Sequence, residues 1–550
     1  MGLEPLARPF RCMITGSVRL REVAVARKEE PREGRLVRRA KQGAAIAGIA
    51  AAGYAAVSAH EVLSNFSPAR DPFEWKPERG RSVLLKGLSL VDVKRGQVSK
   101  DRGILFVDGQ ITDVVAARDL DKVTADRVFD CAGLFAMPGL INCHVHAMMP
   151  GAALIDFDLI LSVKRQTLKN LEECPPHGVT TIRDASGICG LLNEISEGVD
   201  KLELAGPRIV GCGPSIKPRG GYPEFNRRVP GFISSRWGDT CLYANSPETG
   251  REAVRQAVES GARFIKLFFD DRSLFYGHKP LPVLDDDTVR TIVNEAHRLG
   301  RRVAVHQSQL EGFRRAVRLG IDDFEHVPID AVLEPGDVKA FMEEDHGLTP
   351  TLSVGMALGI APKGHPARKD PLIEAMQAER ERVLHDVAPG LAEKAVMKSN
   401  EKLVRLYMEG KAGKGLGAKT MFDPNLYLES FEMKNPNLHM LYDAGARICC
   451  GNDGGTPMGW PASLAVEMRL LEWFGISRPD ILRSATINAA KLLDMESELG
   501  SIEQGKLADL VLLSADPTKD IRNVERVEAV FRSGVLLYQG AGFGLASRPD

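Results

Sequence analysis

The chain has 550 residues, of which 44% are hydrophobic and 26% charged, and its formal net charge at pH 7 is −1. This length exceeds the size at which a single hydrophobic core stops growing, so we expect two or more structural units. The near-neutral charge provides no basic field, which excludes nucleic acid as the expected partner. The nine cysteines are scattered, odd in number and without a C-x-x-C pair, so they predict no disulfide framework.

The beginning of the chain divides into a basic and an apolar part. Residues 1–42 are rich in Lys and Arg without a clear apolar period, which predicts a disordered arm. Residues 43–63 are Ala-rich, and "GAAIAGIAAAGYAAVSA" (43–59) is uncharged throughout. A basic flank, an apolar run and a small-residue ending are typical of a secretory signal or an anchor. The Ala and Gly content and the short length equally favour an Ala-rich helix packed on the protein.

The cellular location therefore has two interpretations. Scattered cysteines that read as small buried hydrophobic residues slightly favour the cytoplasm. If residues 43–59 act as a signal or anchor, the protein is instead secreted or held at a membrane, and membrane contact is expected only in that case.

Short strand-like runs broken by Gly and Asp begin at Ser82, for example "GILFVDGQITDVV". The same texture returns near the other end in "GKLADLVLLSADP" and "VEAVFRSGVLLYQG". Alternating apolar residues with Gly-bearing turns at this spacing favour small antiparallel sheets. We predict that residues 64–137 and 498–545 form one small composite β-sandwich domain from the two ends of the chain.

Residues 138–497 have a different pattern, in which apolar β-branched runs alternate with longer helical stretches. This alternation is typical of βα units and a parallel sheet. The candidate strands are Leu134–Asn142, Val179–Asp184, Arg208–Cys212, Phe264–Phe268, Arg302–His306, Asp323–His326, Leu348–Leu352 and Arg447–Gly451. Eight such strands predict an α/β fold of the (β/α)8 TIM barrel type, whose chemistry lies at the C-terminal strand ends.

Polar residues stand at those predicted ends. "GLFAMPGLINCHVHAMMPG" carries His144 and His146, and because residues i and i+2 of a strand point to the same side, the two imidazoles can bind one metal ion. The other strand ends carry Lys266 in "GARFIKLFF", His306 in "RRVAVHQ", His326 in "DDFEHV" and Asp453 in "RICCGNDGG". Taken singly, His306 and His326 would be interpreted as core histidines, Lys266 as a lysine that reaches the surface, and Asp453 as a turn residue. Their joint placement at the strand ends predicts a metal site.

Lys266 lies between Ile265 and Leu267, which predicts that its ammonium is buried. An unpaired buried ammonium is costly and loses its proton more easily. A neutral amine can react with CO₂ to give a carbamate, so a carboxylated lysine is a candidate ligand here.

These motifs together resemble the amidohydrolase superfamily of metal-dependent hydrolases, within it the prolidase-like and imidazolonepropionase-like group. The resemblance spans about residues 82–540 and depends on the order H-x-H, Lys, His, His, Asp. It includes "PGLINCHVH", "GVTTIRD", "GARFIKLF", "VAVHQSQLEGFRRAVRLGIDDFEH", "CCGNDGG", "SATINAAKLLDM" and "GSIEQGKLADLVLL".

The resemblance implies a two-metal centre in which carboxylated Lys266 bridges two divalent ions. The other implied ligands are His144, His146 and Asp453 for the α metal, and His306 and His326 for the β metal. Zn²⁺ is the expected metal because imidazole and carboxylate ligands suit it. The implied nucleophile is a metal-bridging hydroxide, and one metal polarises the scissile carbonyl. Asp453 is implied to take the proton and pass it to the leaving nitrogen.

The predicted function is therefore hydrolysis of a C–N bond in a small amide, dipeptide-like or lactam substrate, and a homo-oligomer is the family-level expectation.

Asn142 stands where the family often has Asp, and Asn452 where Thr usually precedes the catalytic Asp. In "GPSIKPRGGYPEF", Arg219 and Tyr222 are candidates to hold a polar or anionic substrate group, although an exposed flexible loop is the alternative. Residues 353–446 are long for a βα connection and read as charged helices, part of which is predicted to act as a lid.

Two other functions remain open at this point. A mononuclear deaminase or cyclic-amidine hydrolase of the same superfamily usually lacks the strand-4 lysine and carries Glu shortly after the strand-5 histidine. This chain has Lys266, and Gln309 stands three residues after His306. A non-catalytic assembly protein characteristically loses ligands, whereas all six expected positions are retained here.

Overall fold

The computed structural model describes residues 79–152, 157–187, 189–223, 235, 238–272, 279–409 and 424–544. The predicted basic arm (1–42) and the apolar segment (43–63) lie outside this range. Among the described residues, no helix has the length and apolarity needed to cross a membrane.

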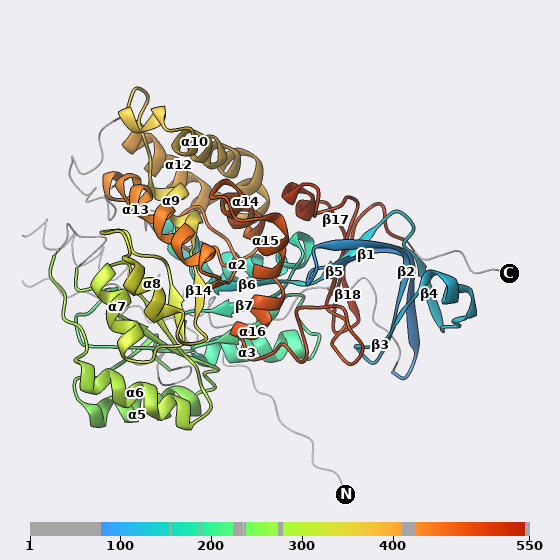
Figure 1. Cartoon of the computed structure of the whole chain (residues 1–550), viewed down its shortest axis with the longest axis horizontal. Helices are drawn as coiled ribbons and strands as arrows, with labels where there is room; N and C mark the ends of the chain where they lie inside the picture. Colours follow the sequence, from blue (N-terminus) through green and yellow to red (C-terminus); the bar gives the residue numbers. More distant parts are fainter. Residues whose placement is uncertain are drawn as a thin grey trace, which may run out of the picture. The chain divides into compact units, whose positions relative to one another are not determined.

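Strands from both ends of the described chain form one eight-stranded sheet, in the order β18-β17-β16-β5-β1-β2-β3 with β4 paired to β1. Figure 1 shows blue and red strands side by side in it. Its members are β1 (Ser82–Asp92), β2 (Gln97–Val107), β3 (Gln110–Val115), β4 (Arg127–Asp130), β5 (Phe135–Pro138), β16 (Leu510–Leu513), β17 (Val527–Arg532) and β18 (Val535–Gln539). Short 3-10 helices flank it: η1 (Ala117–Lys122), η2 (Pro175–His177) and η5 (Ile521–Glu525).

Aromatic side chains fill the core of this sheet. The Phe106 and Phe531 ring centroids lie 5.8 Å apart, and Phe129 stacks on Phe543 at 5.1 Å. These residues come from β2, β4, β17 and the segment after β18, so burial of their rings stabilises the pairing of the two chain ends.

The middle of the chain forms two parallel sheets, of order β6-β7-β8 and β11-β12-β13-β14-β15. Their strands are β6 (Leu140–Val145), β7 (Val179–Asp184), β8 (Arg208–Gly211), β11 (Ile265–Phe268), β12 (Val303–His306), β13 (Asp323–Glu325), β14 (Gly347–Thr349) and β15 (Arg447–Ile448). A separate two-stranded sheet pairs β9 (Ser215–Lys217) with β10 (Cys241–Tyr243). The chain is thus an α/β protein, as predicted.

Backbone hydrogen bonds connect the two parallel sheets at two places. Cys143 N donates to Cys450 O at 2.9 Å, which joins β6 to the segment after β15. Arg263 N donates to Gly211 O at 2.8 Å, which joins the approach to β11 with the end of β8. Each of the eight predicted strand ranges overlaps an observed strand, and β7 has the predicted bounds.

The prediction of one strand over Leu134–Asn142 is wrong. This run contains two strands of different sheets, because β5 ends at Pro138 and pairs with β1 and β16, whereas β6 begins at Leu140 and pairs with β7. Gly139 makes the transition, and a Cβ there would lie 2.1 Å from the Thr180 hydroxyl. Both strands are buried and apolar, so hydrophobicity alone cannot show where the chain changes sheet.

The predicted strand Leu348–Leu352 is also shorter than expected. β14 ends at Thr349, Thr351 has a left-handed φ of 50°, and α9 begins at Leu352. The predicted strand Arg447–Gly451 keeps ladder pairing only over Arg447–Ile448, although Cys449 N still donates to Leu348 O.

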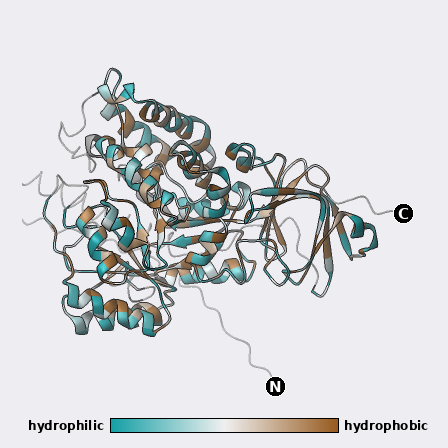
Figure 2. Cartoon of the chain, in the orientation of Figure 1, coloured by the Kyte–Doolittle hydropathy of each residue, from teal (hydrophilic) through white to brown (hydrophobic). Residues whose placement is uncertain are grey.

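Helices separate the parallel strands, and hydrophobic and hydrophilic residues alternate along them as in amphipathic helices (Figure 2). Between the strands lie α2 (Phe157–Glu172), α3 (Cys189–Asp200), α5 (Pro247–Glu259), α6 (Asp286–Arg298), α7 (Leu310–Arg318) and α8 (Pro335–Phe341). Three further helices follow the last parallel strand: α14 (Leu464–Trp473), α15 (Arg478–Ser484) and α16 (Ile487–Leu492). The long connection between β14 and β15 is helical, as predicted. It contains α9 (Leu352–Leu358), η3 (Pro366–Lys369), α10 (Pro371–Arg382), the π-helical turn η4 (Val383–Val387), α11 (Ala388–Leu391), α12 (Lys394–Met408) and α13 (Pro424–Asp443).

Candidate metal centre

The end of β6 carries two imidazoles that face one carboxylate. Nε2 of His144 lies 3.4 Å from Oδ1 of Asp453, and Nε2 of His146 lies 3.3 Å from the same oxygen. Burial lowers the pKa of His144, which favours its neutral form. Nδ1 of His144 faces Oε2 of Glu325 at 2.6 Å, so the proton of the neutral ring belongs on Nδ1 and the Nε2 lone pair is available for a metal.

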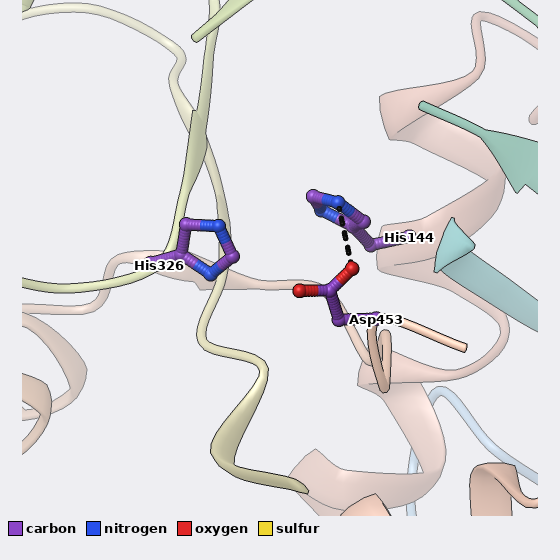
Figure 3. A group of neighbouring side chains, drawn as sticks. All are labelled: His144, His326 and Asp453. Atoms are coloured by element: carbon purple, nitrogen blue, oxygen red, sulfur yellow. Dashed lines mark ion pairs between the residues drawn. The ribbon is translucent and has the colours of Figure 1, made fainter. Parts of the chain in front are cut away.

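These spacings fit a metal site. Two ligand atoms bound tetrahedrally to Zn²⁺ at about 2.0–2.1 Å lie about 3.3 Å from each other. Oδ1 of Asp453 is buried and has no hydrogen-bond partner among the described residues, although two ring nitrogens surround it. The ligand atoms of His144, His326 and Asp453 all lie within 4.8 Å of one another, and Figure 3 shows the Asp453 carboxylate below the His144 ring with His326 to one side. A cation between the His144 and His146 imidazoles and the Asp453 carboxylate would satisfy the Asp453 oxygen.

His326 and His306 form the other side of the centre. Nε2 of His326 lies 2.9 Å from Nδ1 of His306, and Nδ1 of His326 lies 2.5 Å from the Thr351 hydroxyl. Nε2 of His306 lies 3.0 Å from Oδ2 of Asp270. Burial, together with the neighbouring His306, lowers the pKa of His326 well below its usual value, so this imidazole is neutral and can act as a ligand.

Lys266 on β11 is 1% exposed, and its Nζ has no hydrogen-bond partner in the described parts of the chain. Oε1 of Glu325 lies 3.9 Å from this nitrogen. Burial lowers the pKa of Lys266, which favours the neutral amine. The buried lysine expected from its apolar neighbours is therefore present, next to the histidine centre.

A buried ionic network supports the centre, and the sequence interpretation missed it. Arg183 on β7 donates to Glu325 Oε1 at 2.5 Å and to Asp323 Oδ2 at 3.1 Å. Burial alone would raise the pKa of Glu325, but Lys266, His144 and Arg183 hold it well below its usual value. Glu325 therefore stays ionised and fixes the His144 ring. The sequence signal for this network was a charged residue next to an apolar one within a predicted strand, Arg183 in "TTIRD" and Glu325 in "DDFEH".

Asn142 and Asn452, which depart from the family pattern, form hydrogen bonds with each other. Asn142 Nδ2 donates to Asn452 Oδ1 at 2.8 Å, and Asn142 Oδ1 accepts from Asn452 N at 3.3 Å. These bonds hold the start of the His144 segment against the segment that carries Asp453.

The two candidate substrate-binding residues of the loop, Arg219 and Tyr222, have different surroundings. Tyr222 is buried, and its ring stacks on His306 with centroids 4.5 Å apart. Lys217 holds this loop because its ammonium donates to Pro223 O at 2.7 Å. The Arg219 guanidinium is exposed and lies 4.6 Å from the centroid of the Tyr243 ring. Of the two candidates, Tyr222 contacts a residue of the centre.

Backbone geometry explains why the motif "CCGNDGG" around Asp453 contains glycines. Asp453 and His326 both have left-handed φ values, 51° and 71°, which non-glycine residues rarely adopt and which cluster at functional sites. A Cβ on Gly451 would lie 2.7 Å from His144 N, and one on Gly455 would lie 2.4 Å from His146 O. Glycine thus allows the Asp453 segment to approach the two histidines.

We expect Gly451→Ala to lower the free energy of unfolding by about 1–3 kcal/mol, because the added methyl group overpacks the contact with β6. It should also weaken metal binding, because the His144 backbone must move. Urea unfolding and metal titration measure the two effects. Gly390→Ala is the control, because a Cβ at this glycine would contact no neighbouring atom, and it is expected to change neither the free energy of unfolding nor metal binding. Gly364→Ala is unsuitable as a control, because the left-handed φ of 81° at Gly364 would strain an alanine.

Several known proteins are similar to this chain. The profile of the amidohydrolase family matches residues 135–537. Imidazolonepropionase from Geobacillus sp. (strain WCH70) is 31% identical over 450 residues, covering 78% of this chain and 89% of the relative. Ochratoxinase from Aspergillus niger is 23% identical over 430 residues, covering 74% and 76% respectively. The crystal structure of a prolidase complexed with N-methylphosphonate-L-proline superposes with a TM-score of 0.62 at 24% identity, covering 83% of this chain and all of the prolidase.

Proposed function

The chain belongs to the amidohydrolase family, and from that premise we propose that this enzyme is a binuclear metal-dependent hydrolase that cleaves a C–N bond of an amide, dipeptide-like or lactam substrate. The observation that carries the proposal is the unsatisfied Asp453 oxygen 3.3–3.4 Å from two imidazole nitrogens. The relatives named imidazolonepropionase, ochratoxinase and prolidase support the C–N bond class.

The proposed ligand set is His144, His146 and Asp453 for one ion, and His306 and His326 for the other, with carboxylated Lys266 as the bridge. When bound, two divalent ions, Zn²⁺ by the ligand types, supply an acidified water and a polarised scissile carbonyl. Asp453 holds the proton released by the water and passes it to the leaving nitrogen. Tyr222, stacked on His306, is proposed to line the substrate pocket.

Carboxylation of Lys266 is supported by its surroundings. The neutral amine, favoured by burial, attacks the carbon of CO₂: the N–C bond forms, one C=O π bond opens with its electron pair going to oxygen, and the nitrogen gives one proton to solvent water, which leaves a carbamate anion. Such an anion would offer oxygens to two cations, and the buried Arg183 guanidinium nearby adds positive charge. Coordination of the carbamate oxygens by two cations would offset the cost of burying its negative charge.

We further propose that the eight parallel strands, residues 138–497, close into a (β/α)8 barrel and that the eight-stranded sheet belongs to a composite β-sandwich domain (64–137 and 498–545). The hydrogen bonds Cys143 N to Cys450 O and Arg263 N to Gly211 O support closure. The pairing of β5 with β16 supports a domain built from both chain ends.

The mononuclear alternative is less well supported. Lys266 is present and buried, and Gln309, where that group carries Glu nearby, accepts a hydrogen bond from Asp271 N at 3.1 Å. A non-catalytic relative is disfavoured because all six ligand positions keep ligand residue types. A small-molecule substrate and a homo-oligomer remain part of the proposal.

Metal content tests the proposal. Protein purified with bicarbonate and Zn²⁺ is expected to hold about two metal ions per chain by elemental mass spectrometry, and Lys266→Ala is expected to lose at least one of them. Lys339→Ala, outside the centre, controls for the loss of a lysine and should keep the wild-type content. One ion or fewer in the wild type, unchanged in Lys266→Ala, would contradict the binuclear centre.

A further inference from the structure

Helix α13, in the long connection between β14 and β15, buries a charged residue among aromatic ones. Tyr427, Phe431 and Lys434 recur at i, i+4 and i+7 and are 5%, 4% and 5% exposed. That spacing places them on one helix face. Phe431 packs closely against α9, because a Cβ on Gly355 would lie 2.4 Å from its ring. The face that includes Lys434 is therefore directed into the protein.

The Lys434 ammonium lacks an acceptor. Within the described parts of the chain it makes no hydrogen bond and no ion pair, and its contact is with the Phe431 ring, whose centroid is 5.9 Å away. An ammonium carries three donors, and burying it without acceptors is costly. The side chain therefore offers unused donors and a positive charge to a group that comes from outside the described chain.

Packing contacts link this ammonium to the candidate metal centre. Lys434 contacts Phe431, which packs against Gly355 of α9, and α9 begins directly after Thr351, whose hydroxyl lies 2.5 Å from His326. Burial lowers the pKa of Lys434 to about 8, and the carboxylates of Glu467 and Asp453 act in the opposite direction. At pH 7, below that pKa, the charged form still predominates.

Glu467 provides a second link to the centre. Its carboxylate accepts hydrogen bonds from Leu352 N at 2.8 Å, Ser353 N at 2.8 Å and the Ser353 hydroxyl at 2.6 Å. These residues begin α9 directly after Thr351, whose hydroxyl contacts His326. Glu467 thus belongs to the region at the C-terminal end of β14, and Phe431, which contacts Lys434, packs against the same helix α9.

A purely structural role as counter-ion of Glu467 explains less. The Glu467 oxygens already accept three hydrogen bonds, and burial raises the pKa of this carboxyl to about 7, so near neutral pH it is only partly ionised. Glu467 and Lys434 form no ion pair within the described chain, so the ammonium remains available.

We propose that Lys434 is a substrate-binding residue whose ammonium binds a carboxylate of the substrate. The substrate class is then an anionic amide, such as an N-acyl amino acid, with the carboxylate near the scissile C–N bond. This inference rests on the proposed hydrolase function, which it narrows to a substrate class. The helical connection supplies the residue, so substrate choice depends on α13 as well as on the strand ends.

Binding and turnover of matched compounds test it, using the full chain loaded with Zn²⁺. Calorimetry compares N-methylsulfonyl-L-proline, which resists hydrolysis, with 1-(methylsulfonyl)pyrrolidine, which lacks only the carboxylate. Lys434→Met is expected to weaken binding of the first compound by about tenfold to hundredfold and to leave the second unchanged. Turnover of N-acetyl-L-proline against N-acetylpyrrolidine, and of N-acetyl-L-leucine against N-(3-methylbutyl)acetamide, should lose its carboxylate preference in the same variant.

Controls separate a local effect from a structural one. Lys434→Arg keeps the charge and should keep part of the preference, and Lys402→Met removes an exposed lysine of the same connection and should change nothing. Lys434→Gln repeats the test if the Met variant is poorly folded, and thermal melting monitors both. Equal losses for the charged and neutral members of each pair, or no loss for either, would overturn the inference.

The two proposals can fail separately. Hydrolysis of neutral amides without any Lys434-dependent carboxylate preference overturns the anion subsite and leaves the hydrolase function standing. Lys434-dependent binding of N-methylsulfonyl-L-proline without hydrolysis of any amide supports the subsite and contradicts the hydrolase function.

Discussion

Asp453→Asn is expected to lower kcat by about 10³-fold, because the amide cannot accept and return a proton and is a poorer metal ligand than the carboxylate. Asn has nearly the same shape and tolerates the left-handed backbone, with φ of 51°, that Asp453 adopts. The fold should therefore survive, and the loss can be attributed to the carboxylate. Steady-state kinetics at saturating Zn²⁺, with thermal melting of the same samples, measure the two quantities.

Asp494→Asn is the matched control for this substitution. Asp494 also has a left-handed backbone, with φ of 54°, but it is exposed and has no part in the proposed ligand set. We expect it to keep wild-type kcat. An Asp453→Asn enzyme that turns over amides within a few-fold of the wild type would contradict the proton-transfer role of this residue.

Arg183→Met is expected to lower the free energy of unfolding by about 3–5 kcal/mol, because it leaves the buried carboxylate of Glu325 without its guanidinium partner and Asp323 with Arg302 alone. The Arg183, Asp323 and Glu325 side chains are 1%, 2% and 0% exposed, so water cannot replace the lost charge. The variant should also bind metal more weakly, because Glu325 orients His144. Urea unfolding and metal titration measure these effects.

Arg302→Met provides the comparison. Arg302 also pairs with Asp323, at 2.6 Å, but its side chain is 19% exposed and its loss leaves Arg183 on the same carboxylate. We expect a clearly smaller loss of stability and wild-type metal binding. Equal effects of the two substitutions would mean that the network around Glu325 has no special part in holding the centre.

The sequence showed the family and most of the residues of the candidate site, and the comparisons confirm the family. This was possible because the proposed ligands lie in short strands or within a few residues of their C-terminal ends, and strand geometry alone brings residues such as His144 and His146 to the same side. The buried state of Lys266 followed from its immediate neighbours in the same way. Local patterns of this kind need no knowledge of what packs against the strand.

Other features depend on contacts between distant segments, which the local pattern does not contain. The change of sheet at Gly139 is set by Thr180 and by the pairing of β5 with β16. The separation of Tyr222 from Arg219 is set by the ring stack on His306.

The sequence by itself thus determined which residue types stand at the strand ends, because these positions follow from periodicity along one strand. Only the tertiary structure decided which charges support them and which charged side chains are buried. Arg183 and Glu325 lie 142 positions apart, and Lys434 comes from a helix whose buried face was not evident from its charged sequence. Burial makes their charges costly unless they find partners, and partners that meet only on folding are visible only in three dimensions.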